Sequence, residues 1–368
     1  MPLELEFLNA RQGDAIWIRW GTGRQLMVDM GTRQTGNIIH ERILREPESS
    51  RTVDLLVVTH VDVDHIGGIL SCFTDRTDSI PGVSFNDVWF NGWKHLSGEA
   101  ITATSTTLES MGGAQGEVFS NWLQNHPWNK AFQRGPVVRT DLRKICLAEG
   151  LSLTVLGPTY NRLTELKPAW RDSVARAIRR GDLTEVADGL ERLGPTSPPR
   201  LTSKADLQRL ALSPNTSDTS TANGSSIILL LEWEGRRILL TGDAYAGDIR
   251  DGLVALGEGM PVALDLFKVP HHGSAQNMTR ALVEAVDCPL WVFSSDGTMY
   301  RHPDAQAIAQ ILHFGKHPQP MLAFNVCSKY SGWWDDEQWR TMFGYDARYG
   351  DEDDGGITFS FPPVDASL

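Results

Sequence analysis

Residues 59–68 have the sequence Thr-His-Val-Asp-Val-Asp-His-Ile-Gly-Gly, and they follow the short apolar run Asp-Leu-Leu-Val-Val at 54–58. Such a run predicts a buried strand. Because extended chain projects alternate side chains to opposite faces, we expect His60, Asp62 and Asp64 to point one way, with His65 beside them. Imidazole and carboxylate groups suit Zn, Mn or Fe. A polar turn with solvated histidines would explain one His-Asp pair, whereas four such residues directly after a buried strand favour a metal site.

The composition is that of an ordinary globular chain with an acidic balance. The 368 residues are 41% hydrophobic and 22% charged, and the formal net charge is -12. This length is enough for one large domain or two. The acidic balance argues against a broad electrostatic grip on nucleic acid. It does not exclude a nuclease, because bound divalent metal supplies local positive charge.

The cysteines and the N-terminus indicate a cytoplasmic protein. Cys72, Cys146, Cys288 and Cys327 are scattered and form no Cys-x-x-Cys motif, which is typical of buried thiols rather than disulfides or a cysteine zinc site. The first residues lack the basic start and apolar stretch of a secretion signal. No apolar run approaches the roughly 20 residues that cross a bilayer, so we expect no membrane association.

Ligand-type residues also follow three other expected strands, over 25–31, 237–243 and 264–269. They are Asp29, Asp243 and the pair His271-His272. Each has an ordinary explanation when taken alone: an Asp-x-Gly turn, a helix N-cap, or a half-buried histidine. Loops at strand ends converge on one site in α/β architectures. Together with the His60–His65 loop, these residues therefore predict one shared site.

Further strands are expected over 3–9, 15–20, 87–90, 151–158, 226–233, 289–295, 321–326 and 356–361, and helices over 38–44, 117–125, 169–181, 183–193, 244–256, 277–286 and from 304 to 314. Residues 95–147 are harder to assign. Residues 160–222 contain Pro/Ser/Thr-rich stretches that we expect to build no core, which is typical of an insertion or lid.

A local basic patch interrupts this acidic chain. It consists of Arg171, Arg176, Arg179 and Arg180. A solvated helix face would explain it. The alternative is that these arginines bind a phosphate-bearing substrate.

The order of the motifs resembles the metallo-β-lactamase superfamily and, more narrowly, its ComEC-like branch, named for the hydrolase domain of competence DNA-uptake channels. The residues that carry the resemblance are 8–15, 28–31, 59–68, 239–243, 268–274 and the pair His302-Pro303. Asp62 stands where most superfamily members have His, as is usual in this branch. Asn223, within an Asn-x-x-Ser motif, stands where the superfamily has another His. The resemblance covers about residues 3–310, and the segments near 95–147 and 160–222 have no counterpart in it.

The resemblance implies a four-layer αββα sandwich, a single domain over 1–368 with inserts at about 95–147 and 160–222. It implies two divalent metal ions, Zn or Mn, that share a bridging hydroxide. His60, Asp62 and a weakly held Asn223 would bind the first metal, and Asp64, His65 and His272 the second, with Asp243 bridging. Asp29 would support the ligand histidines. Asp64 would act in catalysis, and His271 or His302 would protonate the leaving oxygen.

The implied reaction is hydrolysis by a metal-bound hydroxide, with nucleic acid as the expected substrate. A small phosphodiester, such as a cyclic nucleotide or a phosphorylcholine-type ester, is the alternative that a long lid would favour. A metal-stabilised interaction module with a protein partner in a larger complex is the non-enzymatic alternative. Fold analogy cannot choose among them.

Overall fold

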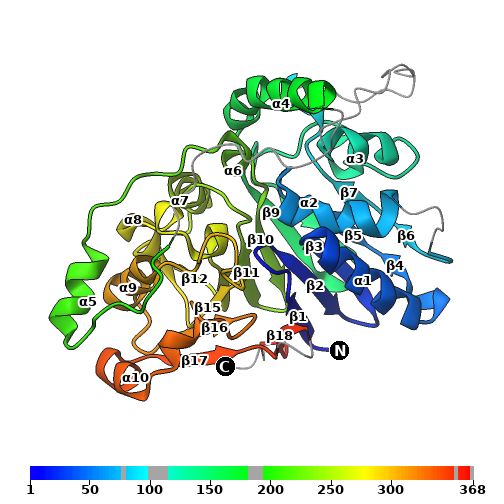
Figure 1. Ribbon diagram of the computed structural model, residues 1–368. Helices are drawn as coiled ribbons and strands as arrows, with labels where there is room; N and C mark the ends of the chain where they lie inside the picture. The colour runs from blue at the N-terminus through cyan, green and yellow to red at the C-terminus, as the bar shows by residue number, and fades with distance from the viewer. Residues whose placement is uncertain (76–79, 98–114, 181–193, 352–354, 365–368) are drawn as a thin grey trace.

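The computed structural model describes residues 1–75, 80–97, 115–180, 194–351 and 355–364, and its core is a pair of stacked β-sheets (Figure 1). The six-stranded sheet has the order β18 (Gly356–Phe361), β1 (Leu3–Leu8), β2 (Ala15–Trp20), β3 (Arg24–Met30), β5 (Leu55–Val57), β7 (Val88–Trp89). The eight-stranded sheet has the order β17 (Asp346–Tyr349), β16 (Met321–Phe324), β15 (Leu290–Phe293), β13 (Leu266–Lys268), β11 (Arg236–Leu240), β10 (Ile228–Trp233), β9 (Ser152–Gly157), β8 (Ile145–Cys146). Two short pairs, β4 (Thr52–Val53) with β6 (Ser84–Phe85) and β12 (Val262–Ala263) with β14 (Val286–Asp287), stand apart from these sheets.

Helices cover the outer face of each sheet, as Figure 1 shows. The helices are α1 (Arg33–Arg45), α2 (Val63–Ile69), α3 (Gln115–Leu123), α4 (Tyr160–Arg180), α5 (Lys204–Ala211), α6 (Thr221–Gly224), α7 (Ala246–Ala255), α8 (Arg280–Val283), α9 (Ala305–Phe314) and α10 (Glu337–Phe343). Helices α1 to α3 lie against the six-stranded sheet, and α7 to α9 lie against the eight-stranded sheet.

The side-chain period of the strands explains the layers. Val28 points into the cluster between the two sheets, and its neighbour Met27 points into the cluster under α1 and α2. Leu231 and Leu230 divide in the same way between the inter-sheet cluster and the one under α7 to α9. Strands buried on both faces are nearly continuous apolar runs, as residues 228–231 of β10 are. The expected αββα sandwich is therefore confirmed.

Most predicted strands are confirmed, and the helices differ more. Helix α4 is one helix from Tyr160 to Arg180, longer than the predicted 169–181. The predicted helix over 183–193 lies outside the described residues. Helix α8 is only Arg280–Val283 rather than 277–286, because Ala275–Asn277 forms a separate 3-10 turn before it. Part of the expected lid contributes to the core: α5 packs on α9 and buries Leu207 and Ala211.

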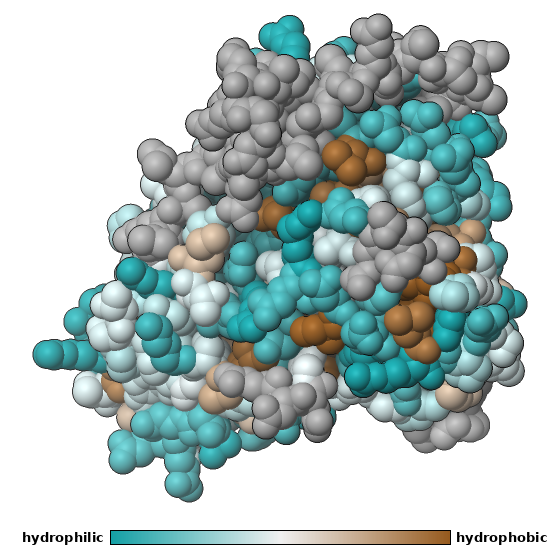
Figure 2. All heavy atoms as spheres, turned by 45° about the vertical axis from the view of Figure 1, so that its right-hand side comes forward, coloured by the Kyte–Doolittle hydropathy of each residue, from teal (hydrophilic) through white to brown (hydrophobic). Residues whose placement is uncertain are grey.

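The outer surface has no single dominant hydrophobic area in the view of Figure 2, where apolar side chains form separate spots among hydrophilic ones. In the described part of the chain, no helix combines the length and apolar character needed to cross a membrane. The first strand, β1, pairs antiparallel with the last, β18, so both ends of the chain meet at one sheet (Figure 1).

Candidate metal centre

The loops that leave the central strands bring the predicted ligands together. The chain turns into the site after β3, β5, β11 and β13, which are inner strands of the two sheets. These loops carry, in chain order, Asp29, His60, Asp62, Asp64, His65, Asp243, His271 and His272. Helix α2 begins at Val63, so the chain is extended only as far as Asp62, and Asp64 and His65 lie in the first helical turn.

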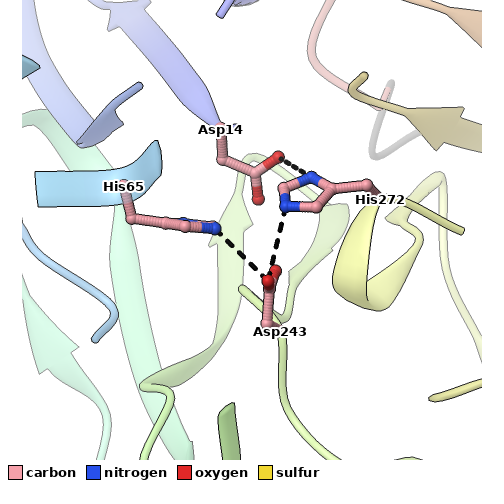
Figure 3. A group of neighbouring side chains, drawn as sticks. All are labelled: Asp14, His65, Asp243 and His272. Carbon is pink, nitrogen blue, oxygen red and sulfur yellow. Dashed lines mark ion pairs between the residues drawn. The ribbon is translucent and has the colours of Figure 1, made fainter. Parts of the chain in front are cut away.

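One carboxylate oxygen, Asp243 Oδ2, lies at the middle of the site. The Nε2 atoms of four histidines surround it: His272 at 3.3 Å, His65 at 3.4 Å, His271 at 3.8 Å and His60 at 3.9 Å. Figure 3 shows the two shortest of these contacts. The remaining predicted carboxylates lie at the periphery, Asp62 Oδ2 at 3.5 Å from His60 Nε2 and Asp64 Oδ2 at 3.5 Å from His272 Nε2.

Hydrogen bonds at Nδ1 fix the tautomer of the two histidines of the first half of the chain. The Nδ1–H of His65 donates to Asp29 Oδ2 at 2.8 Å. The hydroxyl of Thr59 donates to the same carboxylate at 2.6 Å, so its oxygen is left to accept from His60 Nδ1 at 3.0 Å. In their neutral form both rings therefore turn the free Nε2 to the centre, which is the tautomer that binds metal there.

The histidines of the second half follow the same rule with different acceptors. His272 Nδ1–H donates to the Ser294 carbonyl at 2.9 Å. His271 Nδ1–H donates to Asn277 Oδ1 at 2.8 Å, and the Asn277 amide nitrogen is committed to other oxygens. All four imidazoles thus turn the same nitrogen toward Asp243.

Left-handed backbone conformations place His271 and His272, the histidines from the second half of the chain. His271 and His272 both have positive φ, at 48° and 54°, in the short turn Pro270–Gly273 that follows β13. Gly13 permits a further close approach, since a Cβ on it would lie 1.7 Å from the carbonyl oxygen of Asp64. The loop that carries Asp14 therefore rests directly on the loop that carries Asp64.

The charges of the buried groups are coupled. Burial alone would raise the pKa of Asp243, but His272, His65 and His271 hold that pKa well below its usual value. Burial would lower the pKa of His65, yet Asp243 and Asp29 raise it well above the usual range. His272 shows the same shift in its pKa, with burial opposed by Asp243 and Asp14. The carboxylates thus create a strong demand for positive charge at the centre.

The donor set fits a divalent metal. The Nε2 atoms of His60, His65 and His272 are buried and make no hydrogen bond to any described residue. Buried polar atoms without hydrogen bonds are costly. Three such nitrogens that converge on a carboxylate meet the geometric and chemical needs of a metal site of mixed nitrogen and oxygen ligands.

Asp14 was not among the residues that the sequence analysis assigned to the site. One ligand atom each from Asp14, His65, Asp243 and His272 lies within 4.8 Å of the others (Figure 3). However, Asp14 forms an ion pair with the fully buried Lys268 and faces Nδ1 of His272 at 3.4 Å, on the side of the ring away from Asp243. This chemistry makes Asp14 a support for His272 rather than a ligand.

Thr59, Lys268 and Asp218 were also missed. Thr59 and Lys268 lie within the motifs at 59–68 and 268–274, but only the histidines and aspartates of these motifs were assigned to the site. Asp218 stands in a Ser/Thr-rich stretch with no motif around it, so no signal in the sequence marked it.

Of the other predicted site residues, Asn223 and His302 lie beside His271, and the four arginines belong to α4. Asn223, in α6, is buried, and its Nδ2 lies 3.4 Å from His271 Nδ1. The ring of His302 is buried, with its centroid 5.6 Å from that of His271. Arg171 is exposed on α4, and Arg176, Arg179 and Arg180 lie in the last turns of the same helix. Helix α4 packs against α6, so the basic helix adjoins the element that carries Asn223.

A family model and several solved structures are similar to this chain. A family model described as the metallo-beta-lactamase superfamily matches residues 8–71. No curated protein matched the chain. Among solved structures, the chain is similar to Zn(2+)-bound PqqB from Methylobacterium extorquens, with 11% identity, a TM-score of 0.39, and 95% of this chain and 87% of that chain covered. It is also similar to a metallo-β-lactamase with a HARLDQ motif from Cronobacter sakazakii, with 12% identity, a TM-score of 0.29, and 71% of each chain covered.

The layers and the buried Asp/His cluster define an αββα protein able to hold a metal at its strand ends. The family match covers residues 8–71, which include the His60–His65 loop, and the family it describes is the metallo-β-lactamase superfamily of metal-dependent hydrolases.

Proposed function

We propose that this protein is a metal-dependent phosphodiesterase whose substrate is a nucleic acid. The observation that carries the proposal is the set of four imidazole Nε2 atoms around Asp243 Oδ2, with Asp62 and Asp64 at the periphery. A ligand set this rich in carboxylate favours Mn as well as Zn. His60, Asp62 and Asn223 would hold one metal, Asp64, His65 and one of His271 and His272 would hold a second, and Asp243 would serve both.

Bound divalent metal would lower the pKa of water from 15.7 to about 7 and polarise the attacked ester. The residues of the chain supply the rest. Asp29 and Thr59 keep His65 and His60 in the tautomer that binds metal. Whichever of His271 and His272 is not a ligand, or His302 beside His271, would hold a proton for the leaving oxygen, since general acids must lie within reach of the reacting group.

The basic helix supports the nucleic-acid substrate. Helix α4 adjoins α6, and its C-terminal half carries the four arginines named above. Arginine is suited to phosphate because its planar fork binds two oxygens at once. A polymer that enters the site would extend beyond it, and a basic sequence on a helix that adjoins α6 is suited to bind its phosphates.

A small phosphodiester is the second candidate, and a specific observation favours it. The segment 213–220 is tied down beside His271, where Gln276 Nε2 donates to Thr216 Oγ1 at 2.8 Å and the Tyr245 hydroxyl donates to the Ser220 carbonyl at 2.6 Å. A segment fixed beside His271 would limit the size of the substrate that can reach the metal centre. This favours a small ester such as a cyclic nucleotide or a phosphorylcholine-type ester.

The test is a metal analysis joined to a substrate panel. Protein purified without chelator is assayed on bis-p-nitrophenyl phosphate, single-stranded DNA, RNA and a cyclic dinucleotide, in Mn and in Zn. Cleavage of a polymer supports the nuclease. Cleavage of the small esters alone supports the second candidate. Absence of bound metal would leave a non-catalytic interaction module with a protein partner as the better hypothesis.

The joint replacement of Asp64 and His65 by alanine is expected to abolish hydrolysis while the protein still unfolds cooperatively. Both side chains face the centre, and neither packs in an apolar cluster. The matched control is Asp75→Ala, a carboxylate beyond the end of α2 whose partner is the exposed Arg33. Full activity in the Asp64/His65 double variant would exclude the assignment of the site.

A further inference from the structure

Asp218 is a buried carboxylate in a segment without helix or strand. It lies between α5 and α6, and its side chain is only 7% exposed. Its Oδ2 accepts hydrogen bonds from Asn223 Nδ2 at 2.8 Å and from Asn277 Nδ2 at 2.9 Å. Its Oδ1 accepts from the Ser220 backbone N–H at 2.8 Å. A carboxylate that is buried with three donors around it is a built arrangement rather than a solvated loop residue.

These bonds determine how two amides are oriented. The Nδ2 of Asn277 donates to Asp218 and also to the carbonyls of Asp243 and Ala244, at 3.1 and 3.2 Å. Only the Asn277 oxygen is then left for His271, and it accepts from His271 Nδ1 at 2.8 Å. The amide of Asn223 is fixed in the same way, because its nitrogen is committed to Asp218 and its oxygen is the atom left for a metal.

Asp218 cannot itself be a ligand at this centre. It approaches His271 at Nδ1, at 3.5 Å, whereas Asp243 lies on the Nε2 side of the same ring at 3.8 Å. The imidazole therefore separates the two carboxylates. The influence of Asp218 on the centre must pass through His271, Asn277 and Asn223.

The segment that carries Asp218 is anchored by contacts that do not involve this carboxylate. Gln306 Nε2 donates to the Ser213 carbonyl at 2.6 Å, and Gln276 and Tyr245 hold Thr216 and Ser220. Upstream, α5 is packed in the core through Leu207 and Ala211. Removal of the Asp218 side chain is therefore compatible with a folded segment.

We propose that Asp218 is a positioning residue that orients the amides of Asn277 and Asn223, and through Asn277 the ring nitrogen that His271 turns toward Asp243. The inference rests on the proposed function only in that the centre holds metal. The proposal gives the segment between α5 and α6 a specific role. This segment lies outside the sequence motifs, and it would hold His271 in position through Asn277.

The experiment compares Asp218→Ala with Asp206→Ala. Asp206 is a matched control because it is a carboxylate of the preceding helix α5. Its hydrogen bonds, from Thr202, Ser203 and Arg209, stay within the first turns of that helix and the residues just before it. The measurements are Mn²⁺ binding by calorimetry and the tautomer of His271 by ¹⁵N NMR of histidine-labelled, metal-free protein. The His271 signal is assigned by its loss in His271→Gln.

We expect Asp218→Ala to weaken Mn²⁺ binding about 10- to 100-fold, the usual effect of losing a residue that orients ligands. The His271 signal should change from a single Nδ1–H tautomer to a mixture. Asp218→Asn should restore part of both, because one oxygen can still face the two amides. If Asp218→Ala fails to fold, the Mn²⁺ affinity and the His271 tautomer of Asp218→Asn are compared with those of Asp206→Ala instead.

Two results would overturn the proposal: Mn²⁺ affinity and His271 tautomer unchanged in Asp218→Ala, or the same losses in Asp206→Ala. These outcomes are independent of any substrate. If the wild-type protein binds metal but cleaves no phosphodiester, the proposed function fails, and the altered tautomer and Mn²⁺ affinity still establish the role of Asp218.

Discussion

The two halves of the site hold their histidines with acceptors of different charge. In the first half, the fully buried carboxylate of Asp29 accepts from His65 and, through Thr59, orients His60. In the second half, neutral oxygens, the Ser294 carbonyl and the Asn277 amide, accept from His272 and His271. A charged acceptor makes the imidazole a stronger ligand. The comparison teaches that His60 and His65 should contribute more to metal affinity than His271 and His272.

The second half has a charged support one step further away. Lys268, fully buried, forms an ion pair with Asp14, and Asp14 lies behind His272. Burial alone would raise the pKa of Asp14, but Lys268 and His272 hold it well below its usual value. Stability on this side therefore depends on a buried pair, whereas the first half depends on one carboxylate with several donors.

The largest expected effect comes from breaking that pair. Lys268→Met should destabilise the protein by about 3–5 kcal/mol, because it leaves the Asp14 carboxylate buried without a cation. The measurement is the free energy of unfolding in urea. The additional change Asp14→Asn should recover much of the loss, since no buried charge then remains. A loss below about 1 kcal/mol in the single variant, the size of an exposed pair, would show that Lys268 is dispensable.

The same pair gives a pH dependence. A carboxyl whose pKa is lower in the folded protein stabilises it above the unfolded value of about 3.9, and that contribution is lost as the pH falls through the folded value. In Lys268→Met this contribution should be much reduced, so the difference in unfolding free energy between variant and wild type should shrink below about pH 4.

Metal removal tests both halves together. Chelation should lower the free energy of unfolding by about 2.7 kcal/mol relative to protein at a metal concentration 100 times the dissociation constant. The reason is that metal stabilises only the folded state, where the Nε2 atoms converge on Asp243. Thermal unfolding with and without added Mn²⁺, after dialysis against EDTA, measures the shift. Equal unfolding temperatures under both conditions would contradict a resident metal.

Asp29→Asn sharpens the comparison between the halves. The amide can accept but also places an NH₂ among three donors, namely Thr59 N, the Thr59 hydroxyl and His65 Nδ1. We expect metal affinity to fall about 10- to 100-fold, or about 1.4 to 2.8 kcal/mol. Asp54→Asn is the control, because Asp54 also accepts a backbone N–H and a side chain beside β3, from Gln25 and Arg24.

The ranking of the halves depends on one further measurement. Asn277→Ala removes the neutral acceptor of His271. If the charged acceptor matters more, its loss of metal affinity should be smaller than that of Asp29→Asn. A larger loss in Asn277→Ala would reverse the comparison.

The sequence was sufficient to predict the sandwich and the side chains that meet in it, for physical reasons that differ between the halves. Asp29 and His60 lie at the ends of neighbouring parallel strands of the six-stranded sheet, and Asp243 and His271 follow neighbouring parallel strands of the eight-stranded sheet. Because the ends of parallel strands meet at one edge of a sheet, the local pattern implied spatial proximity within each pair. The support of the second half comes from long-range packing. Asp218 and Asn277 are 59 residues apart, and nothing in the local pattern of either predicts their hydrogen bond. The packing of α5 on the core escaped prediction for the same reason, since its partner α9 lies far from it in the sequence.

The smallest expected change in the free energy of unfolding comes from replacing a buried carboxylate outside the site. Glu117, in the first turn of α3, accepts a hydrogen bond from Trp170 Nε1 at 2.9 Å. Burial raises its pKa, and the Trp170 N–H opposes the shift only in part. Asp14 shows the opposite shift because it has Lys268 beside it. Comparing Asp14 with Glu117 therefore shows how the pKa of a buried carboxyl depends on its partner, which is a cation for Asp14 and a neutral N–H donor for Glu117.

A carboxyl whose pKa is raised on folding costs stability as the pH rises above its unfolded value of about 4.3 and through its folded value. Glu117→Gln should remove that slope while the amide oxygen still accepts from Trp170. The absolute change at pH 7 should stay within about 1 kcal/mol, because the lost charge at the helix N-terminus offsets part of the gain. Urea unfolding at pH 4 to 7 measures the slope. If wild type and variant give parallel curves, the Glu117 carboxylate is no costlier in the folded protein than in water, and a neutral donor compensates burial as well as Lys268 does for Asp14.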